Sequence, residues 1–440
     1  RGVSFFPVVG WAERGGYTAT GPGNSVPRFH ITWGTGPGLV APFAAEIEEA
    51  EAAGRLRILA RHRVTGLETT DGAVTGARGD VLVPADTSRG KATPHDVVGE
   101  FTVEARATIV TTGGIGGNHA LVRERWPGRL GSPPRTMVAG VPAYVDGAML
   151  SVAERAGATL IGSDRMWHYV EGLQNWDPIW PQHGIRILPG PSSIWLDATG
   201  KRLPVPLFPG FDTLGTLAHL RATGHDHSWF VLSERIVEKE FTLSGSEQNP
   251  DLTGKDVSLL VRSRLGRGAS GPVRAFLENG ADFVRADRIE DLLAGMRALP
   301  GGDALDPEWA RREIEARDRE MDNPFTKDAQ VAMLRSARAF RGDRLVRTAR
   351  PHRILDRAGG GLIAVKLHVL TRKSLGGILT DLDSRALDAQ GAPIPGLYAA
   401  GEAAGFGGGG VHGYRALEGT FLGGCLFSGR AAGRAAGRAV

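Results

Sequence analysis

The C-terminal stretch PIPGLYAAGEAAGFGGGGVHGYRALEGTFLGG is the part of the sequence that most constrains the fold. It joins an apolar strand ending at Gly401 and Glu402 to a glycine-rich loop, and then to a small-residue helix that we expect to begin near Leu417. Backbone N–H groups at a helix start donate to anions, and the helix dipole favours negative charge there. The stretch therefore predicts a cradle for an anionic cofactor.

This long, ordered stretch resembles the C-terminal signature of the fumarate reductase, succinate dehydrogenase and 3-ketosteroid dehydrogenase flavoproteins. In that family the Gly-Glu pair meets the ribityl chain of FAD, and the following glycines and helix start surround the isoalloxazine ring. The resemblance implies that FAD is the cofactor. It assigns Gly401 and Glu402 to the ribityl chain, and it assigns the flavin edge to Gly419, Thr420 and Leu422.

A second match lies in IVTTGGIGGN, which resembles the family's strand ending in Ala-Thr-Gly-Gly beside the adenosine half of FAD. Two positions depart from the family pattern, because Thr111 replaces an alanine and Val145 replaces the first glycine of a Gly-Asp-Gly helix motif. A valine before the first hairpin resembles the one whose backbone reads the adenine. The further cofactor-binding residues that the resemblance implies are Val64, Thr112, Gly113, Gly114 and Asp146.

The resemblance implies an α/β fold, in which a Rossmann-like FAD-binding domain of the glutathione-reductase type carries an inserted α+β substrate-capping domain. The family opens with a strand, a G-x-G-x-x-G motif and an acidic residue that hold the pyrophosphate and ribose. The glycine clusters at 34–38 and 113–117 do not fit that motif in context. We therefore expect the FAD-binding domain to be incomplete at its N-terminus and the chain to bind FAD weakly.

Hydrophobic spacing supplies the secondary elements of this scheme. It predicts a helix over residues 36–54, a hairpin turning at Asp71 and Gly72, and a helix that stops at Gly157. Alternation from Phe101 to Ile109 predicts one strand that runs into a glycine loop.

A change in residue composition near residue 161 marks the start of the expected inserted domain. Tryptophans, prolines and a charged helical stretch, PEWARREIEARDREM, fill the next part of the chain, and strands with glycine loops return near the end. The expected domains are residues 1–160 for the first part of the FAD-binding domain, 161–355 for the capping domain and 356–440 for the remainder.

Candidate catalytic residues are expected near the flavin. Fumarate reductases of the family carry a His and an Arg at positions that are Lys373 and Ala416 in this chain, so fumarate reduction is disfavoured. A carbon–carbon dehydrogenation instead needs a base for one proton and donors that polarise the substrate carbonyl. Tyr414, His412 and Arg415 lie beside the flavin signature and could serve, as could Lys373.

Each of these residues could instead have a purely structural role. Tyr414 and His412 would then only pack within their loop. In the segment VPRFHITWGTGPG, His30 is a candidate for the active-site wall, or else this segment is a loop anchor and core cover. The histidines of AHLRATGHDHSW fit no standard spacing, so we expect no metal.

Composition excludes several classes of protein. Lys and Arg number 52 against 48 for Asp and Glu, so the small basic excess gives no reason to expect nucleic acid as a partner. The single Cys425 excludes an internal disulfide framework and suggests a reducing compartment. No run of about 18 uncharged apolar residues occurs, so we expect no membrane span and a cytoplasmic protein.

The residues and the resemblance together predict an FAD-dependent dehydrogenase that transfers a hydride between flavin N5 and a carbon–carbon bond. The 3-ketosteroid dehydrogenases are the most similar branch. The tryptophans of the insert either pack in the core or line a pocket for a small organic substrate that is apolar and flat. A fumarate-type reductase of small dicarboxylates and an inactive flavoprotein fragment remain the alternatives. The sequence does not determine the oligomeric state.

Overall fold

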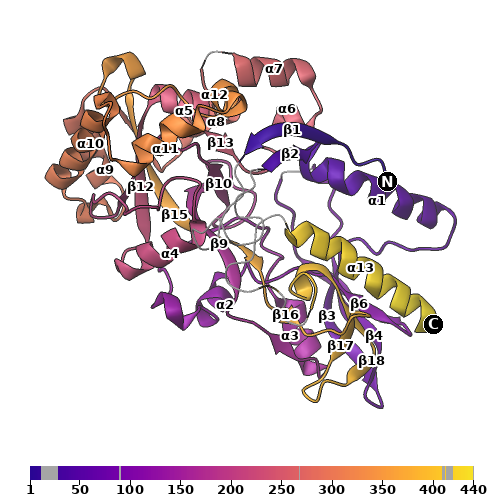
Figure 1. Cartoon of the computed structure of the whole chain (residues 1–440). Helices are drawn as coiled ribbons and strands as arrows, with labels where there is room; N and C mark the ends of the chain where they lie inside the picture. The colour runs from indigo at the N-terminus through magenta and orange to yellow at the C-terminus, as the bar shows by residue number, and fades with distance from the viewer. Residues whose placement is uncertain (11–27, 89–90, 267, 409–411, 413–419, 440) are drawn as a thin grey trace.

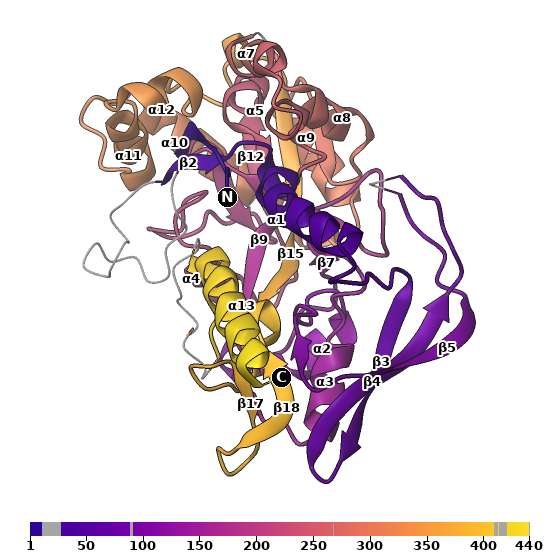
Figure 2. The same ribbon diagram turned by 90° about the vertical axis from the view of Figure 1, so that its right-hand side faces the viewer.

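The computed structural model describes residues 1–440 except 11–27, 89–90, 267, 409–411, 413–419 and 440. In Figure 1 a large sheet with most of the helices occupies the upper left, and the two three-stranded sheets lie below it beside the C-terminal helix. The N-terminus lies beside the first long helix, and the C-terminus lies at the end of the last one (Figures 1 and 2). None of the described helices is long and apolar enough to cross a membrane.

The lower part contains two three-stranded sheets, ordered β3-β4-β5 and β17-β18-β6. Asp71 and Gly72 both have positive φ, 51° and 79°, as the predicted two-residue hairpin turn between β3 and β4 requires. Strand β18 pairs in parallel with β6, and α13 packs on it (Figure 2). The bounds are β3 (His62–Thr70), β4 (Ala73–Leu82), β5 (Val97–Glu104), β6 (Thr108–Val110), β17 (Arg385–Leu387), β18 (Pro393–Ala399), α3 (Ala148–Arg155) and α13 (Thr420–Ala439).

The prediction of one strand from Phe101 to Ile109 is wrong. The chain leaves the β3-β4-β5 sheet after Glu104 and enters the other sheet at Thr108, so β5 and β6 pair with different partners. The apolar alternation continues across the break, which is why periodicity alone could not show it. The short β6 is the piece that delivers the following glycine loop to the end of β18.

The upper part is built on one sheet of eight strands. Its main path is β11-β12-β15-β9-β10-β13, and β7 and β14 also pair with β15. The apolar run of β15 is buried on both faces, as expected of a central strand. The bounds are β7 (Val138–Ala139), β9 (Met166–Gln174), β10 (Gly184–Leu188), β11 (Ile194–Asp197), β12 (His227–Ser233), β13 (Thr242–Leu243), β14 (Phe283–Ala286) and β15 (Leu362–Ser374).

Each edge of β15 is shared by two shorter strands. Strands β12 and β14 flank its first half, whereas β7 and β9 flank its second half. Asp282 fills the junction between β14 and β9, because its carboxylate accepts the Gln174 N–H at 2.7 Å and lies 2.8 Å from His368 Nε2. The Asp282 side chain is buried, so these hydrogen bonds connect neighbouring strands inside the protein.

Helices cover the large sheet, including the side of it that faces the N-terminal strands. The predicted helices at residues 36–54 and in PEWARREIEARDREM are confirmed, the second with Asp306 accepting the Trp309 N–H as its N-cap. The remaining bounds are β1 (Phe5–Gly10), β2 (Arg28–Thr32), α1 (Thr35–Ala52), α2 (His119–Glu124), β8 (Leu160–Ile161), α4 (Thr213–Ala222), α5 (Glu234–Glu240), α6 (Pro250–Thr253), α7 (Val257–Leu265), α8 (Gly271–Asn279), α9 (Ile289–Ala298), α10 (Pro307–Asp322), α11 (Ala329–Ala337), α12 (Arg341–Val346) and β16 (Gly377–Ile378).

Candidate functional site

Two parallel strands, β6 and β18, end side by side in glycine loops. The Ala400 N–H donates to the Val110 carbonyl at 3.0 Å, which holds the two strand ends together. Beyond them, Gly113 and Gly401 have φ of 81° and 67°, a backbone region that favours glycine. The carboxyl ends of adjacent parallel strands are where open α/β sheets bind cofactors.

The end of β15 closes this region from the third side. A Cβ on Gly114 would lie 2.1 Å from Ser374 Oγ and 2.7 Å from Glu402 Oε1, so only glycine fits there. The Ile115 N–H donates to Ser374 Oγ at 2.9 Å, and the Ser374 N–H donates to Glu402 Oε1 at 2.8 Å. Three distant segments of the sequence are thereby locked into one cradle.

Glu402 is a buried carboxyl whose environment acts in two directions. Burial raises its pKa, while N–H bonds from Ser374 and Gly114 and the charges of Lys373 and Arg372 act to lower it. Lys373 and Arg372 come from the same strand end as Ser374. The cradle therefore combines one carboxylate with two nearby cations.

Tyr169 on β9 faces this cation-rich strand end. Its hydroxyl lies 2.7 Å from Lys373 Nζ, which donates the hydrogen bond. The tyrosine is 1% exposed. An ammonium group at this distance stabilises negative charge on the phenolic oxygen, so the pair could take up and return a proton.

A buried ion pair supports Tyr169 from the other side. The guanidinium carbon of Arg186 lies 3.7 Å from the centre of the Tyr169 ring, and Arg186 Nε lies 3.4 Å from Glu171 Oε2. Arg186 and Glu171 are both buried. The guanidinium group packs on the ring face and holds the Tyr169 ring in place.

Aromatic rings form a wall beside this pair. The Phe421 ring lies 5.0 Å from Lys373 Nζ, and its centre lies 5.3 Å from that of His412 and 5.9 Å from that of Trp167. Burial lowers the pKa of the His412 imidazole, so the ring is neutral at pH 7. The arrangement presents an apolar wall with polar groups at its edge.

The structure brings together part of the predicted catalytic set. Lys373 and His412 both contact the Phe421 ring. Tyr414 and Arg415 lie outside the described residues, and His30 has a described backbone in β2 but no described side chain. These three assignments stay predictions.

The structure also brings together only some of the predicted cofactor-binding residues. Those that meet at the strand ends are Gly113, Gly114, Gly401 and Glu402. Val64 lies half-buried in β3, and Asp146 Oδ1 accepts the Ala148 N–H at 2.9 Å within the first turn of α3. The rest of the set consists of Thr112 and Thr420, both exposed, Leu422, which is also exposed on α13, and Gly419, which lies outside the described residues.

Sequence reasoning missed Tyr169 and the residues that support it. The run MWHYVEG alternates large side chains on β9, so Trp167, Tyr169 and Glu171 share one side of the strand. That alternation of aromatic and acidic groups inside a buried strand was the available signal. In the described part of the chain, no cluster of three or more His, Cys, Asp or Glu could hold a metal ion, and the expectation of no metal stays a prediction.

A glycine cradle at the ends of adjacent parallel strands suits a nucleotide cofactor such as FAD, and a family model agrees. The model described as "FAD binding domain" matches residues 1–422, and the chain belongs to that family. The predicted family and cofactor are confirmed, and the close-fitting glycines at the strand ends fit FAD.

The curated relatives narrow the class. A KsdD-like steroid dehydrogenase of Mycobacterium tuberculosis (strain H37Rv) is 60% identical over 436 residues, which cover 99% of this chain and 76% of the relative. A KsdD-like steroid dehydrogenase of Mycolicibacterium smegmatis is 60% identical over 422 residues, with 96% and 76% covered. The predicted enzyme class, an FAD-dependent dehydrogenase, is confirmed by these matches.

Solved structures with the same fold are more distant in sequence. An open-conformation flavocytochrome c3 fumarate reductase matches with a TM-score of 0.59 at 18% identity, covering 98% of this chain and 60% of that one. The 3-ketosteroid Δ1-dehydrogenase of Sterolibacterium denitrificans matches with a TM-score of 0.57 at 17% identity, covering 89% and 61%. They show a mixed α/β flavoprotein fold, and this chain spans about three fifths of their length.

Proposed function

We propose that this protein is an FAD-dependent dehydrogenase that introduces a carbon–carbon double bond next to the ketone of a steroid. The curated relatives support the substrate class. The observation that carries the chemistry is the 2.7 Å contact between Lys373 Nζ and the Tyr169 hydroxyl, beside the glycine cradle.

The cofactor would be held by the strand ends. Gly113, Gly114 and Gly401 give close backbone approach, and Glu402 offers carboxylate oxygens to hydroxyl groups of the cofactor. When bound, FAD supplies the hydride acceptor of the dehydrogenation. The proposal includes a capping domain at residues 161–355 over an FAD-binding domain at 1–160 and 356–440, with β15 reaching from the latter into the capping sheet.

Tyr169 is the proposed proton acceptor. Its oxygen would take the proton from one of the two carbons that become double-bonded, and the electron pair of that C–H bond would form the new bond. Lys373 would donate to the phenolic oxygen and stabilise negative charge on it, and Arg186 over the ring would keep the ring in position.

The apolar wall suits a flat, weakly polar substrate. Phe421, Phe406 and Trp167 are buried rings that make the surroundings of Lys373 apolar, while neutral His412 adds a polar group without adding charge. A substrate bound beside Lys373 would lie against this apolar cluster. Tyr414, Arg415 and His30 remain proposed contributors to the same site.

A second candidate function has an observation in its favour. Arg372, Lys373 and Arg165 place three cations near the aromatic wall, since Arg372 lies 6.0 Å from the Tyr169 ring and Arg165 donates to the His412 carbonyl. Cations of this kind could clamp a dicarboxylate. A fumarate-type reductase is therefore the rival that the experiment must separate.

The test is anaerobic reduction of the FAD-loaded protein by a 3-ketosteroid, followed by visible flavin absorbance and by mass spectrometry of the product. We expect the flavin band to bleach and the steroid to lose two hydrogens. Reoxidation of the reduced protein by fumarate, with no bleaching by any 3-ketosteroid, would identify the rival. Protein that takes up no FAD would instead support the inactive fragment.

The matched variant is Tyr169→Phe. Removing a proton-transfer group should lower the rate of flavin reduction roughly 10²–10⁴-fold, with FAD content unchanged. Tyr144→Phe is the control, because Tyr144 is 72% exposed and should leave the rate unaltered. An unchanged rate in Tyr169→Phe would remove Tyr169 from the mechanism.

A further inference from the structure

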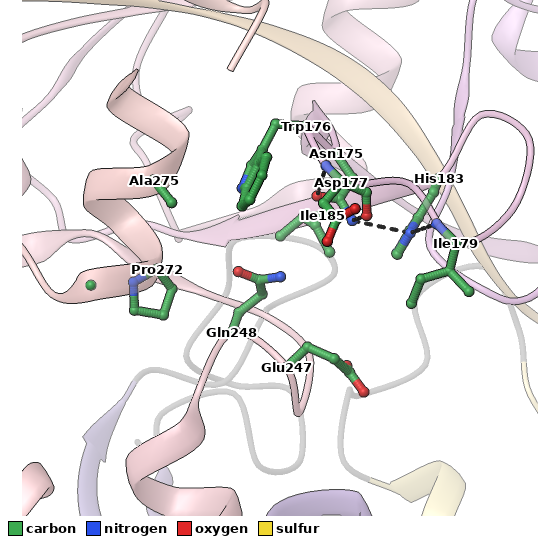
Figure 3. A pocket seen from close by; sticks show the side chains of 11 residues that line it. Asn175, Trp176, Asp177, Ile179, His183, Ile185, Glu247, Gln248, Pro272 and Ala275 are labelled. Atoms are coloured by element: carbon green, nitrogen blue, oxygen red, sulfur yellow. Dashed lines mark hydrogen bonds between the residues drawn. The ribbon is translucent and has the colours of Figure 1, made fainter. Parts of the chain in front are cut away.

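A cavity of about 320 Å³ lies beyond the end of β9, in the upper part of the molecule. Figure 3 shows its lining side chains converging from the loop after β9, the start of β10, the segment before α6 and helix α8. Its walls mix an indole, two carboxylates, an imidazole, two side-chain amides and aliphatic groups. A cavity of this size accommodates a small organic molecule.

The tautomer of His183 is fixed by its neighbours. Its Nδ1 lies 3.1 Å from Asn175 Nδ2 and 3.2 Å from the Ile179 backbone nitrogen, and both of these groups are donors. Nδ1 is therefore the acceptor, and the ring proton is on Nε2. Burial lowers the pKa of His183 to about 4, so the imidazole is neutral at pH 7.

His183 consequently offers one N–H donor to the cavity that it lines. Within the described chain no protein group accepts a bond from Nε2, while the ring face is occupied by Trp180 at 3.7 Å. The imidazole is thus fixed in place by two hydrogen bonds and a stacked ring. A donor held this firmly selects a ligand that carries an acceptor.

Asp177 and Trp176 supply the complementary features. The Asp177 N–H is bound by Asn175 Oδ1 in a turn, and in the described chain no group bonds to the Asp177 carboxylate. Trp176 is 43% exposed and stands on the cavity wall (Figure 3). The cavity therefore offers an acceptor, a donor and a flat apolar face together.

These features discriminate among ligand classes. The carboxylates of Asp177 and Glu247 on the lining disfavour anions. An ammonium group could satisfy the carboxylates but gives the His183 N–H no acceptor. A hydroxyl both donates and accepts, and a ring with several hydroxyls also has C–H faces that pack on an indole.

We propose that this cavity is a second binding site, for a small, neutral, ring-shaped polyol such as a monosaccharide. Trp176 stacks on the ring, Asp177 accepts from its hydroxyls, His183 Nε2–H donates to one of them, and the Gln248 amide can do either. The chemistry needed is that of a sugar or a cyclitol.

The site is distinct from the flavin site. Ile185 lines the cavity, whereas its neighbour Arg186 lies over the Tyr169 ring. Consecutive side chains of a strand point to opposite faces, so the cavity and Tyr169 lie on opposite sides of β10. A ligand in the cavity would therefore leave the substrate site open.

The test is saturation-transfer difference NMR on the whole chain with D-glucose, D-galactose, D-mannose and myo-inositol, and with tetramethylammonium, which has no hydrogen-bond acceptor, as the cationic probe. We expect saturable transfer to at least one of the four polyols and none to tetramethylammonium. Saturable binding of tetramethylammonium alone, or of no probe at millimolar concentration, would overturn the proposal.

Two variants connect binding to the cavity. Trp176→Ala and Asp177→Ala should each weaken the polyol signal at least tenfold in apparent affinity, and Trp309→Ala is the control because Trp309 is 39% exposed on the distant α10. Equal binding by Trp176→Ala and Trp309→Ala would place the sugar elsewhere and refute the assignment. Circular dichroism of each variant confirms that the fold is retained.

Discussion

At the scale of single residues, the chain places two unusual groups side by side on β9. Tyr169 is surrounded by cations, whereas its neighbour His168 is buried with both ring nitrogens unpaired in the described part of the chain. His168 stacks on Trp126, with ring centres 5.1 Å apart. The first residue is the proposed proton acceptor, whereas burial keeps the second neutral at pH 7.

His168 should make stability depend on pH. Burial lowers its pKa to about 3, with the charges of His119 and Arg129 adding to the effect. The unfolded chain takes up a proton below about pH 6.5 while the native chain does not, so its contribution is complete above that pH and falls as the pH drops towards 3. At pH 5 the loss from this residue should be about 2 kcal/mol.

Urea unfolding at pH 7 and pH 5 measures this effect. His168→Leu should unfold with a smaller difference between the two pH values than the parent chain, by about 2 kcal/mol. His95→Leu is the control, since His95 is exposed. An identical pH difference in parent and His168→Leu would show that the native imidazole takes up protons normally.

At the scale of elements, the ends of β6, β15 and β18 are joined by the contacts of one glycine. Gly114→Ala would push a methyl group against Ser374 Oγ and Glu402 Oε1. Because backbone and buried polar groups must move to make room, we expect FAD affinity to fall at least tenfold. Gly128→Ala is the matched control, since a Cβ there meets nothing within 4 Å.

Fluorescence titration of the apoprotein with FAD gives both affinities. If Gly114→Ala binds FAD as tightly as Gly128→Ala, then the strand ends do not form the cofactor cradle. Visible absorbance of the purified proteins provides a second measure of the bound flavin. Thermal unfolding of the apoproteins separates a lost cradle from a lost fold.

Local signals predicted many of these elements. Gly54, with φ of 69°, follows the end of α1 where the sequence placed a helix stop, and Asp71 with Gly72 turns the first hairpin. Such features depend on neighbouring residues only. The break between β5 and β6 depends on which distant strand each half pairs with, so the single predicted strand was wrong.

The candidate site likewise contains residues that local sequence predicts and residues that only distant contacts reveal. Gly401, Glu402 and the glycines after β6 could be found because they sit in contiguous motifs. Tyr169 could not, because the contacts that mark it come from Lys373 and Arg186, which are distant in sequence. A tyrosine becomes a candidate acid or base only when the fold supplies its charged neighbours.

At the scale of the whole molecule, Asp282 fastens the large sheet at the point where the neighbour of β15 changes. Asp282→Ala would leave the Gln174 N–H and the His368 ring without their buried acceptor. We expect it to lower the free energy of unfolding by about 3 kcal/mol, since each unpaired buried group costs about 1–3 kcal/mol.

Urea denaturation of Asp282→Ala at neutral pH measures the loss. Asp287→Ala, at an exposed position just after β14, should change stability by less than about 0.5 kcal/mol. A loss in Asp282→Ala as small as that of the control would mean that water or a rearranged side chain replaces the carboxylate.

The shared edges of β15 also bear on how the chain is made. Val138 of β7 pairs with Leu370 of β15, about 230 residues later in the sequence. Strands β9, β12 and β14 also precede β15 and pair with it. Contacts so distant in sequence close large loops and form slowly. During synthesis the upper sheet must remain open, with its strand edges exposed, until residue 374 has left the ribosome. Production of this protein should therefore depend strongly on chaperones that shield unpaired strands.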